Sequence, residues 1–147
     1  MTVEPLDKND APAIRRLLEQ SGLPTADLDQ TAIRFLGCHD EEGLAGVVAL
    51  ELYGSVGLLR SLAVRTSLRG RGLGMRLVDV AEEVAAQNGV RNLYLLTTTA
   101  ADFFRAGGFS GSARGDAPEA IRGTTEFAGL CPDSAAFMVK QLTAAKA

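Results

Sequence analysis

Histidine and cysteine are scarce in this chain, and their scarcity limits the chemistry it can carry. The 147 residues include one histidine, His39, and two cysteines, Cys38 and Cys131. Two cysteines do not make a disulfide framework, and no cysteine or histidine cluster has the spacing of a metal site. We therefore expect a fold that needs neither disulfides nor a metal, in a reducing, cytoplasmic setting.

Long apolar runs and a positive net charge are also lacking. No run approaches the roughly 20 apolar residues that cross a bilayer, and the charged N-terminus, with Glu4, Asp7, Lys8 and Asp10, is unlike a secretory signal. The net charge of -3 argues against a nucleic-acid-binding protein, which needs a basic surface. We expect a soluble protein without nucleic-acid or membrane partners.

The chain has the length of one ordinary domain, and 46% of its residues are hydrophobic. Its hydrophobic periodicity predicts an α/β fold in which two helices precede an antiparallel meander. The expected helices are one that is capped by Asn9 or Asp10 and ends at Gly22, and others at 27–36, 73–87 and 100–106, with a helical turn near Pro118. The expected strands are 1–6, 35–39, 44–53, 56–64, 91–97, 109–114 and 136–142.

A glycine-rich loop, Arg69-Gly70-Arg71-Gly72-Leu73-Gly74, lies between a strand and the clearest amphipathic helix of the chain. The first turn of a helix leaves about four N–H groups unpaired, and the helix dipole adds roughly half a positive charge. Glycines allow a ligand to approach those N–H groups closely. The loop therefore predicts a site for a phosphate or pyrophosphate.

Several interpretations of this loop compete. A nucleotide-binding Walker loop requires Gly-Lys followed by Ser or Thr, which is absent, and the dinucleotide fingerprint requires G-x-G-x-x-G, whereas the spacing here is G-x-G-x-G. The pattern R-x-x-G-x-G fits Arg69, Gly72 and Gly74. A glycine-rich turn with solvated arginines is the alternative without a ligand.

The R-x-x-G-x-G loop, the strand before it and the later unit Phe103-Phe104-x-x-x-Gly108-Phe109 together resemble the GNAT superfamily of N-acetyltransferases. The resemblance covers nearly the whole chain and implies one N-acetyltransferase domain over residues 1–147. It implies a mixed, mostly antiparallel sheet flanked by helices, in which the strand 59–64 diverges from the strand 93–97. It also implies acetyl-CoA as the cosubstrate and an amine as the acceptor.

The resemblance assigns residues to the coenzyme. Pantetheine would lie along the strand before the loop, and the pyrophosphate on the amides of the loop. The coenzyme-binding residues are then Leu62, Ala63, Val64, Arg69, Gly70, Arg71, Gly72, Leu73, Gly74, Met75, Thr97 and Phe104. At the last two positions the chain departs from the family, because many members have Asn where Thr97 stands and Tyr where Phe104 stands. That Tyr often protonates the departing thiolate, which Phe104 cannot do.

More narrowly, the chain is similar to an N-acetyltransferase branch that is associated with arsenic-resistance operons. The segments that carry this similarity are 57–64, 93–100, Glu126-Phe127 and Leu130-Cys131-Pro132. The similarity implies acetylation of a small toxic amino acid, such as an arsenic- or phosphorus-containing glutamate mimic.

Acetyl transfer needs a neutral amine, so a base must remove a proton from the acceptor. Glu51 is the first candidate base and Glu126 the second, with loss of the proton to water as the alternative. His39 is more typical of a surface residue. Arg60 and Arg114 are candidates to hold an anionic group of the acceptor, and Phe127 is a candidate wall of its pocket. Cys131 could touch the acceptor or be a buried structural thiol.

Three other functions compete with transfer to a small molecule. Phe104 keeps open a non-catalytic acyl-CoA-binding module. A protein or peptide acceptor would need an open groove, whereas the segment 115–134 is expected to cap the site. Nucleic-acid binding by the arginine cluster ranks last. The resemblance also allows a homodimer that pairs through the final strand and the meander.

Overall fold

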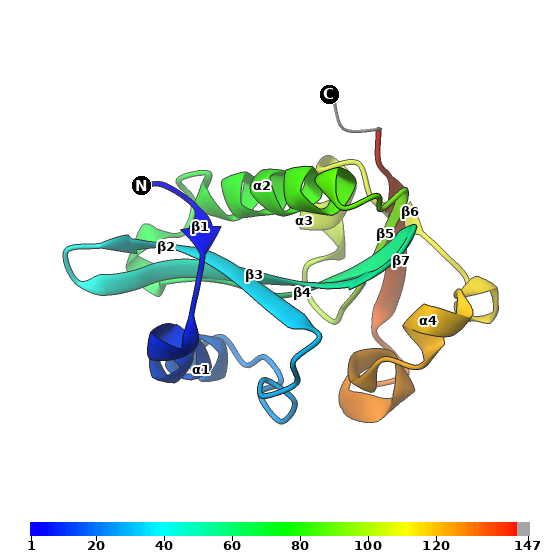
Figure 1. The fold of residues 1–147 in the computed structure, drawn as a ribbon, viewed down its shortest axis with the longest axis horizontal. Helices are drawn as coiled ribbons and strands as arrows, with labels where there is room; N and C mark the ends of the chain where they lie inside the picture. Colours follow the sequence, from blue (N-terminus) through cyan, green and yellow to red (C-terminus); the bar gives the residue numbers. More distant parts are fainter. Residues whose placement is uncertain (144–147) are drawn as a thin grey trace.

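The computed structural model describes residues 1–143, which form one seven-stranded sheet with helices on both faces (Figure 1). The strand order is β1-β2-β3-β4-β5-β7-β6. The strands are β1 (Glu4–Pro5), β2 (Ile33–Asp40), β3 (Gly43–Tyr53), β4 (Val56–Val64), β5 (Asn92–Thr97), β6 (Ser110–Gly111) and β7 (Ala136–Gln141). All neighbouring pairs are antiparallel except β4 and β5, which run parallel. The mixed, mostly antiparallel sheet is the one that the sequence predicts.

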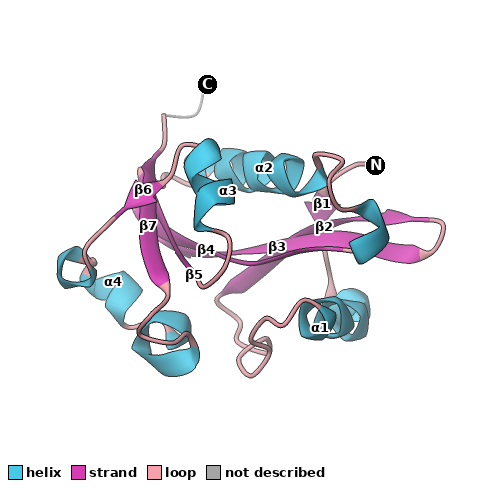
Figure 2. Ribbon diagram, turned by 180° about the vertical axis from the view of Figure 1, so that it is seen from behind, coloured by secondary structure: helices cyan, strands magenta, loops and turns pink. Residues whose placement is uncertain are grey.

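The helices divide between the two faces of the sheet, as Figures 1 and 2 show. Helices α2 (Leu73–Gln87) and α3 (Ala101–Ala106) lie on one face, and α1 (Ala11–Gln20) and α4 (Glu119–Arg122) lie on the other. Short helical turns complete the fold: η1 (Lys8–Asp10), η2 (Thr66–Leu68), η3 (Arg114–Asp116) and η4 (Glu126–Leu130).

The largest apolar cluster lies between α2 and the sheet. The inner face of α2 contributes Leu77, Ala81 and Ala85, each fully buried against residues of the central strands. The helix approaches β3 so closely that a Cβ atom on Gly46 would lie 2.8 Å from Cδ1 of Leu77. Because α2 is held this tightly, the loop before it is fixed relative to the sheet.

Three expected elements differ from the structure. The expected strand at 1–6 is reduced to the two residues of β1. The expected helix at 27–36 is wrong: residues 26–29 form a turn, and β2 already begins at Ile33. Here pairing of β2 with β3 along its whole length outweighs a weak helical pattern. The expected strand at 109–114 is reduced to the two residues of β6, because only Ser110 and Gly111 pair with β7.

Packing of α2 on the sheet predicts a large stability cost for a cavity at Leu77. We expect Leu77→Ala to lower the free energy of unfolding by about 2–5 kcal/mol, measured by urea denaturation. Glu83→Ala, at an exposed position of the same helix, should change it by less than about 0.5 kcal/mol. Equal effects of the two substitutions would contradict this description of the core.

Candidate active site

The parallel strands β4 and β5 diverge halfway along their length. Their pairing is limited to Val56, Gly57 and Leu58 of β4, which face Asn92, Leu93 and Tyr94 of β5. Beyond this point β4 continues beside β3 as far as Val64, and β5 continues beside β7 as far as Thr97. The facing edges of the two strands are therefore not paired with each other in their second halves.

A β-bulge turns β4 at the point of divergence. Ser61 and Leu62 of β4 stand opposite the single residue Val48 of β3, between the pairs Ala49–Arg60 and Val47–Ala63. Ser61 has φ = 57°, the one positive φ among non-glycine residues in the described part of the chain. An extra residue of this kind bends a strand locally, and here the bend carries residues 62–64 away from β5.

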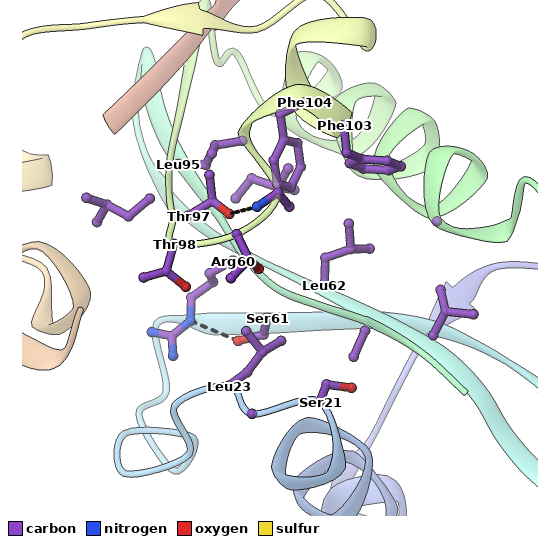
Figure 3. A pocket seen from close by; sticks show the side chains of 18 of the residues that line it. Ser21, Leu23, Arg60, Ser61, Leu62, Leu95, Thr97, Thr98, Phe103 and Phe104 are labelled. Carbon is purple, nitrogen blue, oxygen red and sulfur yellow. Dashed lines mark hydrogen bonds between the residues drawn. The ribbon is translucent and has the colours of Figure 1, made fainter. Parts of the chain in front are cut away.

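A cavity of about 1140 Å³ occupies the gap between the diverging strands. Figure 3 shows it between β4, the turn after β5, helix α3 and the loop after α1. The residues that line it are 21–26, 59–64, 68–70, 72–75, 95–100, Phe103, Phe104, Glu126 and 130–132. All the residues that the sequence assigns to the coenzyme lie on this wall except Arg71, which lines a second cavity of about 390 Å³ together with Met1 and Arg76.

The glycine-rich loop presents a row of free amides at one end of this cavity. Within the described chain, the backbone N–H groups of Gly70–Met75 donate no hydrogen bond, and the first amide of α2 that does is Arg76, to the carbonyl of Gly72. Gly72 caps the helix with φ = 83°, a conformation that favours glycine. The Arg69 side chain bonds to the Val64 carbonyl at 3.1 Å. The arrangement can bind an anion.

Thr97 and Phe104 form part of the wall opposite β4. The hydroxyl of Thr97 accepts a hydrogen bond from the Ala100 amide at 3.0 Å, which fixes the turn into α3 (Figure 3). Phe104 is buried edge-to-face against Phe103 and Phe109, with ring centroids 5.1 and 5.7 Å away. This wall is therefore apolar where Phe104 stands, and that side chain offers no proton donor.

A buried ionic cluster lies at the other end of the cavity, centred on Arg60. Its guanidinium binds both carboxylate oxygens of Asp27, at 2.5 and 2.6 Å, and one oxygen of Glu51 at 2.9 Å. Its Nε lies 3.1 Å from Oε2 of Glu126 and donates to the Ser61 hydroxyl at 3.2 Å. All four charged side chains are at most 5% exposed.

This geometry corrects the expectation that Arg60 grips an anionic group of the acceptor. The side chain is fully buried and holds three carboxylates of its own chain. Burial acts to lower the pKa of Arg60, but its hydrogen bonds to Asp27 and Glu51 and the charge of Glu126 together raise that pKa above its ordinary value. The guanidinium therefore stays charged and has no exposed edge to offer a ligand.

The two candidate bases have different surroundings. Glu51 does not line the cavity; it is held between Arg60 and the hydroxyl of Tyr53, which donates to Oε1. Burial and this bond raise the pKa of Tyr53 above its ordinary value, so the hydroxyl keeps its proton. Glu126 does line the cavity. Burial raises its pKa to about 7, with Arg60 lowering it and Asp27 and Glu51 raising it further.

Cys131 lies on the cavity wall beside Glu126. Burial, and then the Glu126 carboxylate, raise the pKa of its thiol to about 11. Since the thiolate is the nucleophilic form, this cysteine is poorly suited to form an acetyl-enzyme. The other cysteine, Cys38, is buried in the core under α2.

Two other candidates from the sequence, Arg114 and Phe127, do not line the cavity; their contacts lie within or beside the segment 114–135. Arg114 donates to the carbonyls of Pro132 and Ala135, both at 3.1 Å, and its guanidinium lies 5.4 Å from the ring centroid of Phe127. Phe127 packs on Phe137. His39 pairs with Asp10 at 2.9 Å, away from the cavity. Arg114 and Phe127 are therefore not brought to the site.

Asp27 is the site residue that sequence reasoning misses. It lies in the segment expected to be helical, and nothing in its local pattern distinguishes it from a surface carboxylate. Its partner, Arg60, is 33 positions away along the chain. Only the fold brings the two together.

The family follows from a comparison with known proteins. The family model described as "Acetyltransferase (GNAT) family" matches residues 5–109. The chain belongs to this family. The matched range includes the diverging strands, the glycine-rich loop and α3, which together form most of the cavity wall.

Several solved structures share the fold of this GNAT chain. N-acetylglutamate synthase from Neisseria gonorrhoeae, solved with coenzyme A and N-acetyl-glutamate, is 22% identical, with a TM-score of 0.79; the match covers 97% of this chain and 35% of that one. The present chain thus spans about a third of that synthase. Rv2747 from Mycobacterium tuberculosis, solved with CoA, is 20% identical, with a TM-score of 0.78 and 97% and 100% coverage.

A third similar structure is the ribosomal-protein-S18-alanine N-acetyltransferase from Escherichia coli. It is 17% identical, with a TM-score of 0.74, and the match covers 99% of this chain and 96% of that one.

Among residues 1–143, no helix has the length and apolarity to cross a membrane. In the same range, no group of three or more His, Cys, Asp or Glu side chains is arranged to hold a metal ion.

The raised pKa of Glu126 predicts how stability depends on pH. Between the ordinary value of 4.5 and about 7 the folded protein binds more protons at this group than the unfolded chain. Its contribution to the free energy of unfolding therefore falls as the pH rises through this window. As the pH rises from 4.5 to 8, the free energy of unfolding of Glu126→Gln should increase by about 1–3 kcal/mol relative to that of the wild type. Urea denaturation at each pH measures this difference. A difference that does not vary with pH would contradict the assignment.

Proposed function

We propose that the protein transfers the acetyl group of acetyl-CoA to the amine of a small molecule. The observation that carries the proposal is the combination of diverging strands and free loop amides around one cavity. The edge of β4 that faces β5 is unpaired beyond Leu58 and can bond to an extended chain of amides such as pantetheine. The amides of Gly70–Met75 can bind a pyrophosphate at the adjoining end.

The residues present fit this coenzyme. Leu62, Ala63 and Val64 would hold the pantetheine, and the amides of the glycine-rich loop, with Arg69, would hold the pyrophosphate. The cavity, of about 1140 Å³, is large enough for the pantetheine arm and an acceptor together. Apolar groups of Leu62, Phe103 and Phe104 would exclude water from the thioester.

When bound, acetyl-CoA supplies a thioester carbon at which the amine forms the new C–N bond as the C–S bond breaks. Glu126 is the side chain suited to take the proton from the amine, because it borders the cavity and its pKa, about 7, lies near neutrality. Phe104 supplies no acid, so the leaving thiolate would obtain its proton from water or from Glu126.

The acceptor would enter at the end bounded by residues 21–26, Glu126 and residues 130–132. Two segments far apart in the sequence contribute to the wall at this end, which favours a small molecule over a protein or peptide. The resemblance to the arsenic-resistance branch favours an amino acid that mimics glutamate. Since Arg60 is not free, the carboxylate of such an acceptor would rely on backbone amides.

Release of free thiol from acetyl-CoA tests the proposal. The acceptor panel should contain glutamate, its phosphinic and arsinic analogues, neutral amino-acid amides and diamines, each against a control without amine. We expect release with at least one class and loss of at least tenfold in kcat for Glu126→Gln. Binding of acetyl-CoA without release for any amine would favour the alternative that Phe104 leaves open, a non-catalytic acyl-CoA-binding module.

The loop conformation predicts a selective effect on coenzyme binding. We expect Gly72→Ala to raise the Kd for acetyl-CoA about tenfold by calorimetry, because an alanine at φ = 83° is strained and displaces the amides. Gly54→Ala is the matched control: Gly54 has φ = 68° in the β3–β4 turn, outside the cavity. It should lower stability but leave the Kd unchanged; similar Kd values for both variants would count against the loop as the phosphate site.

A further inference from the structure

The guanidinium of Arg60 joins two segments that line the acceptor end of the cavity. Asp27 belongs to the loop after α1, whose residues 21–26 line the cavity. Glu126 begins η4, and residues 130–132 at its end also line the cavity. Gln30 also donates to Thr125 at 2.9 Å, which connects the same two segments a second time. Neither segment contributes a strand to the sheet here, so Arg60 is their shared attachment to it.

The three carboxylates around Arg60 are not equally compensated. Asp27 receives two hydrogen bonds from the guanidinium, and Glu51 receives one from Arg60 and one from Tyr53. Glu126 has a single contact with the guanidinium, at Nε. Buried carboxylates without full compensation favour their protonated form. The least compensated carboxylate is thus the one that borders the cavity.

We propose, on the basis of the proposed function, that Arg60 is a positioning residue that holds Glu126 at the acceptor end of the cavity, and that Asp27 and Glu51, bound to the same guanidinium, offset its positive charge beside Glu126. In this role Arg60 fixes where the base lies, through the contact at Nε. The negative charges of Asp27 and Glu51 offset the positive charge of Arg60, which alone would make Glu126 a weaker base. Glu126 is the group that touches the acceptor.

The charged and titratable groups that face Glu126 come from four parts of the fold. Arg60 faces it from β4, Glu51 with Tyr53 from β3, Asp27 from the loop after α1, and Cys131 from its own segment. Of these, Asp27 and Glu51 raise the pKa of Glu126, whereas Arg60 and a hydrogen bond from Cys131 lower it. Tyr53 and Cys131 keep their protons near neutral pH, because both have raised pKa values. Removal of either carboxylate charge should therefore lower the pKa of Glu126.

The test compares Asp27→Asn and Glu51→Gln with a matched control, Asp40→Asn. Asp40 is held by Arg65 through two hydrogen bonds, at 2.7 and 3.0 Å, but lies outside the cavity. Carbon-13 NMR of protein labelled at the glutamate carboxyl carbons measures the titration of Glu126, assigned by its loss in Glu126→Gln. We expect a midpoint near 7 in the wild type and in Asp40→Asn. In Asp27→Asn and Glu51→Gln it should lie about one pH unit lower.

Turnover gives the second readout, with the amine that releases most thiol. The acid limb of kcat at saturating acceptor should move to lower pH in Asp27→Asn and Glu51→Gln by the same amount as the NMR midpoint, with the KM for acetyl-CoA within about twofold of the wild type. Arg60→Lys keeps the charge but cannot bind three carboxylates. It should lower kcat at least tenfold.

The outcomes separate this inference from the proposed function. Folded Asp27→Asn and Glu51→Gln variants, judged by circular dichroism, with an unchanged NMR midpoint would overturn the inference whether or not any amine is acetylated. A shifted midpoint in these variants with an unmoved acid limb of kcat would also overturn it, because Glu126 would then not be the base. If no amine is acetylated but the midpoint of Glu126 is shifted, the electrostatic part of the inference is supported and the proposed function is overturned. If Asp27→Asn fails to fold, Glu51→Gln decides alone.

Discussion

The divergence of β4 from β5 is the constraint on which the rest of the site depends. A sheet normally satisfies its backbone groups with the neighbouring strand, and here that pairing ends after Leu58 and Tyr94. The extra residue at Ser61 bends β4, whereas β5 stays paired with β7 along its whole length. The helix α2 packs across the sheet and fixes the loop Arg69–Gly74 at the mouth of the gap. A cavity with one polar backbone edge follows from these three conditions.

The two ends of the cavity have opposite electrostatic character. At the loop end, free amides and the N-terminus of α2 offer partial positive charge. At the far end, three carboxylates surround a single buried guanidinium. A ligand with an anionic tail and a reacting centre next to an ammonium matches this gradient. In the proposed function, this polarity would orient a coenzyme thioester and an amine acceptor relative to each other.

The sequence predicts the parts of the site that local patterns encode. Arginine and glycine spacing before an amphipathic helix identifies the loop Arg69–Gly74, and the resemblance to the GNAT superfamily adds residues 62–64. These signals are local because a turn needs particular residues at particular positions. The apolar character of the wall at Phe104 can likewise be predicted from the sequence, because it depends on one side chain in a short helix.

The ionic cluster could not be predicted, because its members come from distant parts of the chain. Asp27 lies in a stretch whose weak helical pattern is overridden by the pairing of β2 with β3. Arg60 resembles a ligand-binding arginine in sequence, and only the packing of residues 21–32 and η4 against β4 shows that its partners are internal. Glu51 and Glu126 are the same residue type, so their identity alone does not distinguish them as bases. Their different exposure to the cavity decides which of them can reach an acceptor.

Backbone amide hydrogen exchange, measured with and without acetyl-CoA, tests whether this cavity binds the coenzyme, because it locates the coenzyme on the chain without knowledge of the acceptor. We expect acetyl-CoA to slow exchange in residues 62–64 and in the loop Gly70–Met75. The amides of this loop are free in the structure. Exchange in the β2–β3 hairpin should be unchanged. Slowing confined to other segments, or no slowing at saturating acetyl-CoA, would contradict the assignment of this cavity to the coenzyme.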